Sequence, residues 1–373
     1  IELDNDNPSH YTYRASCFQE IKDYTNALKD YDKAIDLAPE DTENYNNRAD
    51  FYENIEDYSN ALKDYAKVIE ISSDSNSTSR AYNNRALVYE NQEKYELAID
   101  ELSKAIDIDP NDPLYFSNRA LSYENLENYN KAIEDHTAAI ELDNDNPSHY
   151  TYRASCFNEM EDYTNALKDY DIAIDLAPEN PYSYYNRAYF YNRIEDYSNA
   201  LKDYTRVIEL LPDDSYFYSE RALVYVKMNQ YENANKDFSK SIELDPKNTT
   251  PYFYRAKMYK QLEEFEKEKA DYQKSIEIDE KDPEGYFYLA KFYVSQNKIF
   301  QAISNFEKSI SRLSADLGYY ITAPNGIDEI KLADIYITRA QLYKNVEALE
   351  LMCEDYKNAC DLGDCEIYNK KCK

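Results

Sequence analysis

The sequence predicts an all-α protein, a solenoid of about ten antiparallel helix-turn-helix repeats. Three observations support this fold class. A Tyr-x-x-Arg-Ala pattern returns every 34 residues through most of the 373-residue chain. Within a period, apolar residues recur at i, i+3, i+4 and i+7 over two stretches, the pattern of two amphipathic helices. The chain has 4 glycines, which leaves little material for β-hairpin turns or nucleotide-binding loops.

Composition excludes several classes of function. The formal net charge of −31 repels a phosphate backbone and an anionic membrane surface, so we expect no nucleic-acid partner. No apolar run approaches the roughly 18 residues that a membrane span requires, so we expect no membrane insertion. The sequence does not indicate a compartment, and it predicts no cofactor.

The register of the repeats follows from the Arg-Ala pairs. Residues 1–18 recur as residues 140–157, and the intervening spacing is four periods plus three residues that lie within 72–80. Repeats 1–4 and 5–8 are therefore a duplicated block. The first residue of each pair defines position 7 of the repeat. In chain order this position holds Arg14, Arg48, Arg85, Arg119, Arg153, Arg187, Arg221, Arg255, Leu289 and Arg339.

This register predicts the domain organisation. Residues 1–7 are expected to end a preceding, truncated repeat, and residues 8–310 to form repeats 1–9. Residues 311–332 form an insertion, in which "APNG" reads as a turn. The insertion is either a plain connector or a segment that contributes to ligand or partner binding. Residues 333–373 are expected to form an atypical tenth repeat and a C-terminal capping helix.

The repeat resembles the tetratricopeptide repeat, of the Tyr-x-x-Arg-Ala subtype. The fifth repeat has the large, small and aromatic residues of that family at Tyr150, Ala154, Phe157, Tyr163, Ala166, Tyr170, Ala173 and Pro178. The resemblance implies a right-handed superhelix in which small residues allow the two helices of a repeat to approach closely. It also implies that the first helices of the repeats line a concave groove.

Position 7 is usually apolar in this family, but it is arginine in nine of the ten repeats, and position 23 is acidic in the same nine. In the ninth repeat Leu289 and Asn305 replace both. Their joint loss predicts a guanidinium–carboxylate pair across each hairpin. The predicted structural pairs are Arg14–Asp30, Arg48–Asp64, Arg85–Glu101, Arg119–Asp135, Arg153–Asp169, Arg187–Asp203, Arg221–Asp237, Arg255–Asp271 and Arg339–Asp355.

The groove positions supply candidate peptide-binding residues. Asparagine at position 6 resembles the asparagine ladder of superhelical tetratricopeptide proteins, whose amides bind the backbone of an extended peptide. The alternative is that asparagine recurs only because the repeats are duplicates, and that its amides are solvated. The position-6 candidates are Asn47, Asn84, Asn118 and Asn186, with Tyr152 at the same position of the fifth repeat.

Aromatic residues and a few lysines crowd the same face later in the chain. We expect them to form an exposed recognition surface, with partial burial inside a tightly curved superhelix as the alternative. They are Tyr182, Tyr185, Tyr189, Tyr216, Phe253, Tyr254, Phe287 and Tyr288, with Lys257 and Lys291.

Other reactive side chains are expected to be structural. Cys353, Cys360, Cys365 and Cys372 are predicted as buried thiols, while disulfides such as Cys353–Cys365 or Cys360–Cys372, or a metal site, remain open. His136 takes the place of a core aromatic, and Cys156 that of a small core residue. Glu268 occupies a position that favours a small residue, so either its helix shifts or its carboxylate meets a cation. We predict no catalytic site and no metal site.

These patterns predict a non-enzymatic scaffold that holds an extended peptide or a partner protein in its concave groove. The competing interpretation is a self-associating rod or spacer, which would form homo-oligomers by stacking its open repeat ends.

Overall fold

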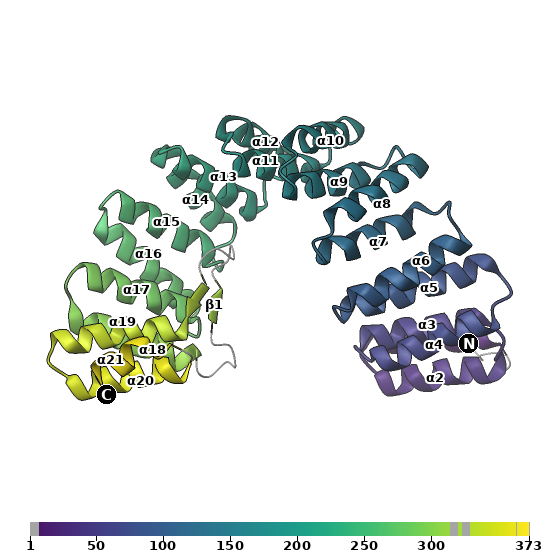
Figure 1. Cartoon of the computed structure of the whole chain (residues 1–373), viewed down its shortest axis with the longest axis horizontal. Helices are drawn as coiled ribbons and strands as arrows, with labels where there is room; N and C mark the ends of the chain where they lie inside the picture. Colours follow the sequence, from purple (N-terminus) through teal and green to yellow (C-terminus); the bar gives the residue numbers. More distant parts are fainter. Residues whose placement is uncertain (1–6, 314–319, 323–328, 363, 373) are drawn as a thin grey trace. The chain divides into compact units, whose positions relative to one another are not determined.

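The computed structural model describes residues 7–313, 320–322, 329–362 and 364–372 (Figure 1). In these ranges the chain forms twenty-one helices and one pair of short strands. Contacts divide it into an N-terminal unit, residues 1–187, and a C-terminal unit, residues 188–373. Residues 1–6, which hold most of the predicted end of a preceding repeat, lie outside the described ranges.

The N-terminal unit consists of helical hairpins, each packed on the next. Its helices are α1 (Pro8–Glu20), α2 (Tyr24–Leu37), α3 (Thr42–Asn54), α4 (Tyr58–Ile71), α5 (Ser75–Asn91), α6 (Tyr95–Ile108), α7 (Pro113–Asn125), α8 (Tyr129–Leu142), α9 (Pro147–Glu159), α10 (Tyr163–Leu176) and the first half of α11 (Pro181–Arg193). The three additional residues of the third repeat lengthen the start of α5, which has 17 residues.

The C-terminal unit continues the same construction. It contains the rest of α11 and α12 (Tyr197–Leu210), α13 (Ser215–Lys227), α14 (Tyr231–Leu244), α15 (Thr250–Gln261), α16 (Phe265–Ile278), α17 (Pro283–Ser295), α18 (Ile299–Leu313), α19 (Leu332–Asn345), α20 (Leu349–Asp361) and α21 (Glu366–Lys371). None of the described helices has the length and apolar character needed to cross a membrane.

The insertion contains an antiparallel strand pair that the sequence analysis did not predict. β1 (Tyr320–Thr322) pairs with β2 (Glu329–Lys331), and Ile321 lies opposite Ile330. β-Branched residues favour this extended backbone. The predicted turn at 323–326 lies outside the described residues.

A residue with left-handed backbone geometry turns each hairpin. The turn residues have φ between 54° and 62°, although none of them is glycine. Backbone hydrogen bonds close the turn: the N–H of Asp57, next after Glu56, donates to the Tyr52 carbonyl at 2.8 Å. Asp57 then caps α4 by accepting a hydrogen bond from the N–H of Asn60. The turn residues are Lys22, Glu56, Glu93, Glu127, Glu161, Glu195, Asn229, Glu263, Asn297 and Glu347.

Small residues lie where the two helices of a repeat cross. In the fifth repeat Ala154, Ala166 and Ala173 are completely or almost completely buried, because a larger side chain would force the helices apart. Glu268 breaks the pattern in the eighth repeat. It is 2% exposed, its Oε2 has no hydrogen-bond partner in the described structure, and burial raises its pKa while the Lys260 charge opposes that effect.

The C-terminal cysteines form two disulfides, Cys353–Cys372 and Cys360–Cys365. The prediction of buried free thiols was therefore wrong, and so were both disulfide pairings named as examples. Cys353 on α20 meets Cys372 at the end of α21 because the short α21 packs back on α20. Cys360 and Cys365 flank the connection between the same two helices.

Candidate functional site

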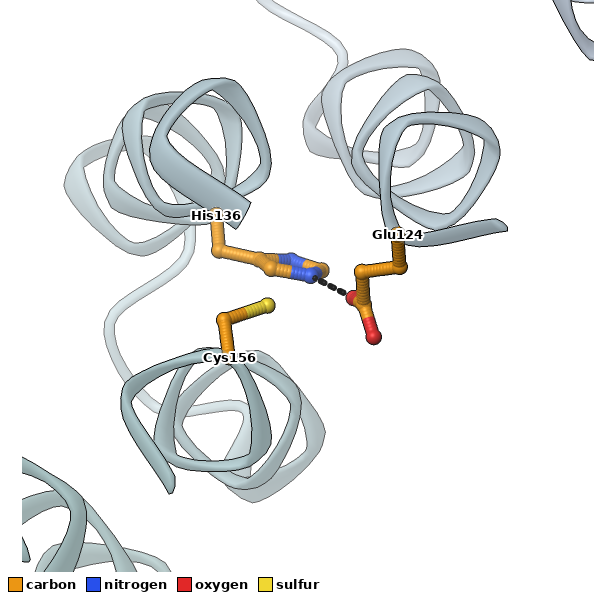
Figure 2. Close-up of side chains that lie close together, drawn as sticks. All are labelled: Glu124, His136 and Cys156. Carbon is orange, nitrogen blue, oxygen red and sulfur yellow. Dashed lines mark hydrogen bonds and ion pairs between the residues drawn. The ribbon is translucent and has the colours of Figure 1, made fainter. Parts of the chain in front are cut away.

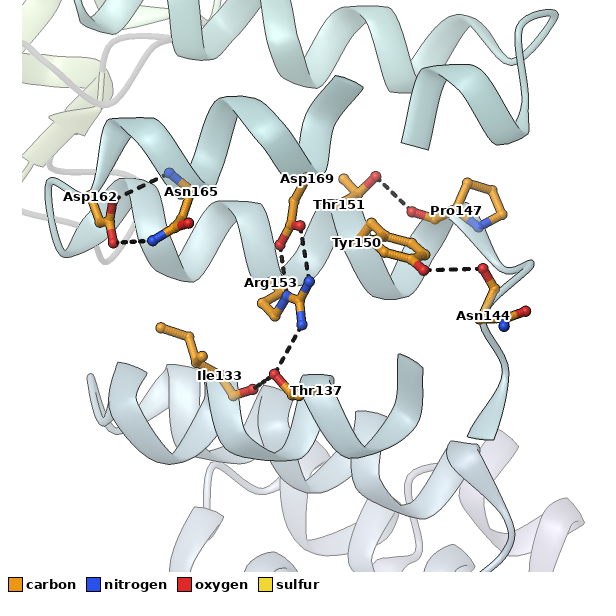
Figure 3. Close-up of polar contacts among 10 residues, drawn as sticks. All are labelled: Ile133, Thr137, Asn144, Pro147, Tyr150, Thr151, Arg153, Asp162, Asn165 and Asp169. Atoms are coloured by element: carbon orange, nitrogen blue, oxygen red, sulfur yellow. Dashed lines mark hydrogen bonds and ion pairs between the residues drawn. The ribbon is translucent and has the colours of Figure 1, made fainter. Parts of the chain in front are cut away.

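The guanidinium of Arg153 joins the two helices of the fifth repeat (Figure 3). It projects from α9, and its Nε and Nη2 donate to the two Asp169 oxygens on α10 at 2.7 and 2.9 Å. The Asp169 side chain is 3% exposed. Pairs with the same two hydrogen bonds occur at Arg14–Asp30, Arg48–Asp64, Arg119–Asp135, Arg221–Asp237, Arg255–Asp271 and Arg339–Asp355.

Six of these arginines also make a contact that the sequence did not predict. The Nη1 of Arg153 donates to Thr137 Oγ1 of the preceding repeat at 3.0 Å. The guanidinium thus links three helices, two in its own repeat and one in its neighbour. The signal is a short polar residue sixteen positions before the arginine, as in Arg48–Asp32, Arg119–Ser103, Arg187–Asp171, Arg221–Thr205 and Arg255–Ser239.

Two of the predicted pairs differ from the others. Arg85 and Glu101 form an ion pair, with 3.0 Å between Arg85 Nε and Glu101 Oε2. These two atoms do not have the geometry of a hydrogen bond. Arg187 and Asp203 belong to different units, and their pairing stays a prediction.

Aromatic rings lie beside the half-buried guanidinium groups at two recurring spacings within the repeat. The guanidinium carbon of Arg221 lies 5.9 Å from the ring centres of both Tyr218 and Tyr225. These residues stand three before and four after the arginine, and therefore on the same side of the helix. Cation–π attraction adds to the ion pair. The Arg-centred network is thus an element of the fold.

The position-6 asparagines are half-buried, and two of them, Asn84 and Asn118, already have hydrogen-bond partners in the protein. Asn118 Nδ2 donates to Asn83 Oδ1 at 2.7 Å, and Asn83 Nδ2 donates to Asn84 Oδ1 at 3.3 Å. Asn47 and Asn186 are also half-buried. The amides of Asn84 and Asn118 would have to exchange these bonds to bind a peptide backbone, and peptide binding by this set stays a prediction.

The predicted aromatic surface divides into two groups. Tyr152, Tyr182, Tyr189 and Tyr216 are exposed, whereas Tyr185 and Tyr254 are half-buried. Phe253, Phe287 and Tyr288 are only 2%, 8% and 8% exposed, so their prediction as an exposed recognition surface was wrong. They pack together at the α15–α17 contact, where the Tyr288 ring lies 5.8 Å from Phe253 and stacks on Tyr272 at 5.7 Å.

A cavity of about 720 Å³ lies in the C-terminal unit, lined by first helices of successive repeats. Tyr189 comes from α11, Tyr216 from α13 and Tyr254 from α15. Its apolar lining is Leu223, Val226 and Met258, and its polar and charged lining is Asn192, Ser219, Glu220, Lys227, Asn248, Thr250, Lys257 and Gln261. A cavity of this size holds a drug-sized group or one to two bulky side chains. We call it the tyrosine pocket.

Glu220 is the acidic residue of the tyrosine pocket. Burial raises its pKa to about 7, although the Tyr204 hydroxyl and the Lys227 ammonium both act to lower it. At neutral pH, therefore, a substantial fraction of this carboxyl is protonated and can both donate and accept hydrogen bonds. Glu220 has no signal in the sequence, because only its surroundings distinguish it from other glutamates.

A second hollow adjoins the tyrosine pocket and shares Lys257 and Gln261 with it. Three lysines line it: Lys257, Lys260 and Lys291. Its carboxyl is the buried Glu268, whose pKa is raised. The Lys257 ammonium lies 4.9 Å from the ring centre of Tyr288, and that of Lys291 lies 5.3 Å from the ring centre of Phe287. We call Lys257, Lys260 and Lys291 the lysine cluster. It is a local concentration of positive charge in a chain of net charge −31.

Five tetratricopeptide-repeat family models match the chain. Their matches cover residues 11–41, 40–111, 117–181, 181–214, 215–248 and 251–282. The chain is a tetratricopeptide-repeat protein. No curated protein matches it in sequence.

Solved structures of other tetratricopeptide-repeat proteins resemble this one in fold. A protein from Parabacteroides merdae is 17% identical, with a TM-score of 0.51 over 68% of this chain and 98% of its own. Yeast Tom70 is 18% identical, with a TM-score of 0.45 over 98% and 94% of the two chains. YrrB, described as a TPR protein with an unusual peptide-binding site, is 24% identical, with a TM-score of 0.39 over 49% and 93%.

Proposed function

We propose that this tetratricopeptide-repeat protein is a non-enzymatic scaffold whose C-terminal unit binds an extended segment of a partner protein. The segment places a bulky apolar side chain in the tyrosine pocket and an acidic side chain against the lysine cluster. The observation that carries this proposal is the adjacency of a mostly apolar cavity and three lysines on the first helices of the repeats.

The lining of the tyrosine pocket supports a peptide side chain as the occupant. Tyr189 and Tyr216 are about half exposed, and rigid amphipathic rings give large contact areas at a low cost in conformational entropy. Leu223, Val226 and Met258 provide an apolar floor. Ser219, Asn192 and Glu220 can satisfy the backbone amides of a bound segment.

The charge around the pocket supports an acidic residue next to the apolar one. The lysine cluster faces a hollow whose carboxyl, that of Glu268, is buried and has a raised pKa. The residues that line the hollow therefore carry three ammonium groups and one carboxyl group. Charges that lie more than a Debye length from the hollow are largely screened at physiological salt. A carboxylate in this hollow would gain charge-assisted hydrogen bonds.

Selection from a displayed library of random dodecapeptides tests this function. We expect the selected peptides to share a bulky apolar residue close to Asp or Glu, and their affinity, measured by fluorescence anisotropy, to fall as salt increases. The double variant Lys260→Glu/Lys291→Glu should bind about tenfold or more weakly. Lys202→Glu, an exposed lysine on the second helix α12, is the matched control and should bind normally.

Three results would contradict the proposal. The selected peptides could be basic, the double lysine variant could bind as well as the control, or the library could yield no binder. If the library yields no binder and sedimentation velocity shows concentration-dependent oligomers, the self-associating rod would replace the peptide-binding scaffold as the proposed function.

A further inference from the structure

A buried cluster of Glu124, His136 and Cys156 lies in the N-terminal unit, far in sequence from the tyrosine pocket (Figure 2). The three side chains come from α7, α8 and α9 and point toward one another. One ligand atom of each lies within 4.8 Å of the other two. His136 and Cys156 are completely buried, and the Glu124 side chain is 22% exposed.

The cluster replaces an apolar contact that other repeat junctions use. At this register the position-24 residue of one repeat packs on the position-10 residue of the next, as in Tyr31–Phe51, Tyr65–Val88 and Phe238–Met258. Between repeats four and five the same two positions hold His136 and Cys156. An imidazole and a thiol fill this space less well than an aromatic ring and a large apolar side chain, so packing alone does not account for them.

The polar atoms of the cluster are incompletely satisfied. His136 Nε2 lies 2.7 Å from Glu124 Oε1, whereas the buried Nδ1 has no hydrogen-bond partner in the described part of the chain. Most buried polar atoms have a partner. Glu124 has no ion pair other than that with His136 among the described residues.

We propose that Glu124, His136 and Cys156 bind a divalent transition-metal ion of the zinc class. A thiolate, an imidazole and a carboxylate are ligands that zinc accepts together, whereas magnesium and calcium prefer oxygen ligands alone. Ligand atoms of a tetrahedral zinc site lie about 3–4 Å apart. The cluster reaches this geometry when Cys156 moves inward and Glu124 moves away from His136. Cys156 loses its proton to solvent on binding, and a water molecule completes the coordination.

The exposed part of Glu124 provides the path by which the ion enters. Its side chain is long and partly solvated, so it can turn from the imidazole to a metal at little cost. The bound ion would fasten α7, α8 and α9, and thereby the junction of repeats four and five. The role is structural and independent of peptide binding in the C-terminal unit.

Cobalt(II) titration of the tag-free protein with its disulfides intact tests this site. Within the described chain Cys17 and Cys156 are the free cysteines, so a thiolate-to-cobalt charge-transfer band reports one of these two. We expect one equivalent to bind with this band in the presence of excess magnesium, and zinc to displace it. His136→Tyr and Cys156→Ser should each weaken binding about 100-fold or more.

Cys17→Ser is the matched control, because Cys17 occupies the same repeat position as Cys156 but is exposed, and it should keep full binding. His136→Tyr introduces the residue that other repeats carry at this position, so it should fold normally. If either ligand variant fails to fold, the cobalt spectrum of the unaltered protein decides. The absence of the thiolate band, or its survival in Cys156→Ser, would overturn the proposal.

Discussion

Replacing Arg153 with leucine should lower the free energy of unfolding by about 3–5 kcal/mol, the usual cost of leaving one partner of a buried ion pair alone. Asp169 would lose both hydrogen bonds from the guanidinium, yet its side chain would remain buried at 3% exposure. Thr137 on the preceding repeat would lose its link as well. Urea denaturation followed by circular dichroism measures the change.

The chain itself supplies the matched control. Its ninth repeat carries Leu289 and Asn305 in place of the arginine and the acid, and both are buried. The double variant Arg153→Leu/Asp169→Asn reproduces that pair, so it should recover most of the stability lost in the single variant. A double variant as unstable as Arg153→Leu would show that the ion pair itself, rather than an unpaired carboxylate, determines the effect.

Replacing Phe253 with alanine should cost about 3–5 kcal/mol of folding stability, because the variant leaves a cavity in a packed core. The ring is 2% exposed, and its centre lies 6.3 Å from that of Tyr272 and 5.8 Å from that of Tyr288. Thermal and urea denaturation measure the loss.

Tyr216→Ala is the comparison for Phe253→Ala. Tyr216 is 47% exposed, so its replacement should cost about 1 kcal/mol or less. Equal losses of stability in the two variants would contradict the division of the predicted aromatic surface into a buried group and an exposed group.

The repeat pattern predicted the helical hairpins because small and large apolar residues recur at the same positions of each repeat. Ala154, Ala166 and Ala173 mark where the helices cross. The loss of arginine and acid together in the ninth repeat was enough to infer the pairing found at Arg153 and elsewhere. The link from Arg153 to Thr137 was harder to infer, because the residue sixteen positions before the arginine varies and is Ile69 in the case of Arg85.

Features that depend on local departures from the repeat were not predictable. The resemblance assigned Phe253 and Phe287 to the groove, whereas both are buried, and their burial depends on how α15 and α17 pack. The raised pKa of Glu220 depends on burial that no sequence motif encodes. Cysteine spacing did not identify the pairing of Cys353 with Cys372, because that pairing requires α21 to fold back on α20. Strands β1 and β2 lie in an insertion outside the repeat register.

The central claim is that the tyrosine pocket is where a partner segment binds. Its most direct test is the dissociation constant of a selected peptide, measured by fluorescence anisotropy with the unaltered protein, Tyr216→Ala and Tyr163→Ala. Tyr163 is exposed at the start of the second helix α10 and serves as the control. We predict binding about tenfold or more weaker for Tyr216→Ala and unchanged binding for Tyr163→Ala. Equal affinity of Tyr216→Ala and the unaltered protein for the peptide would contradict the account.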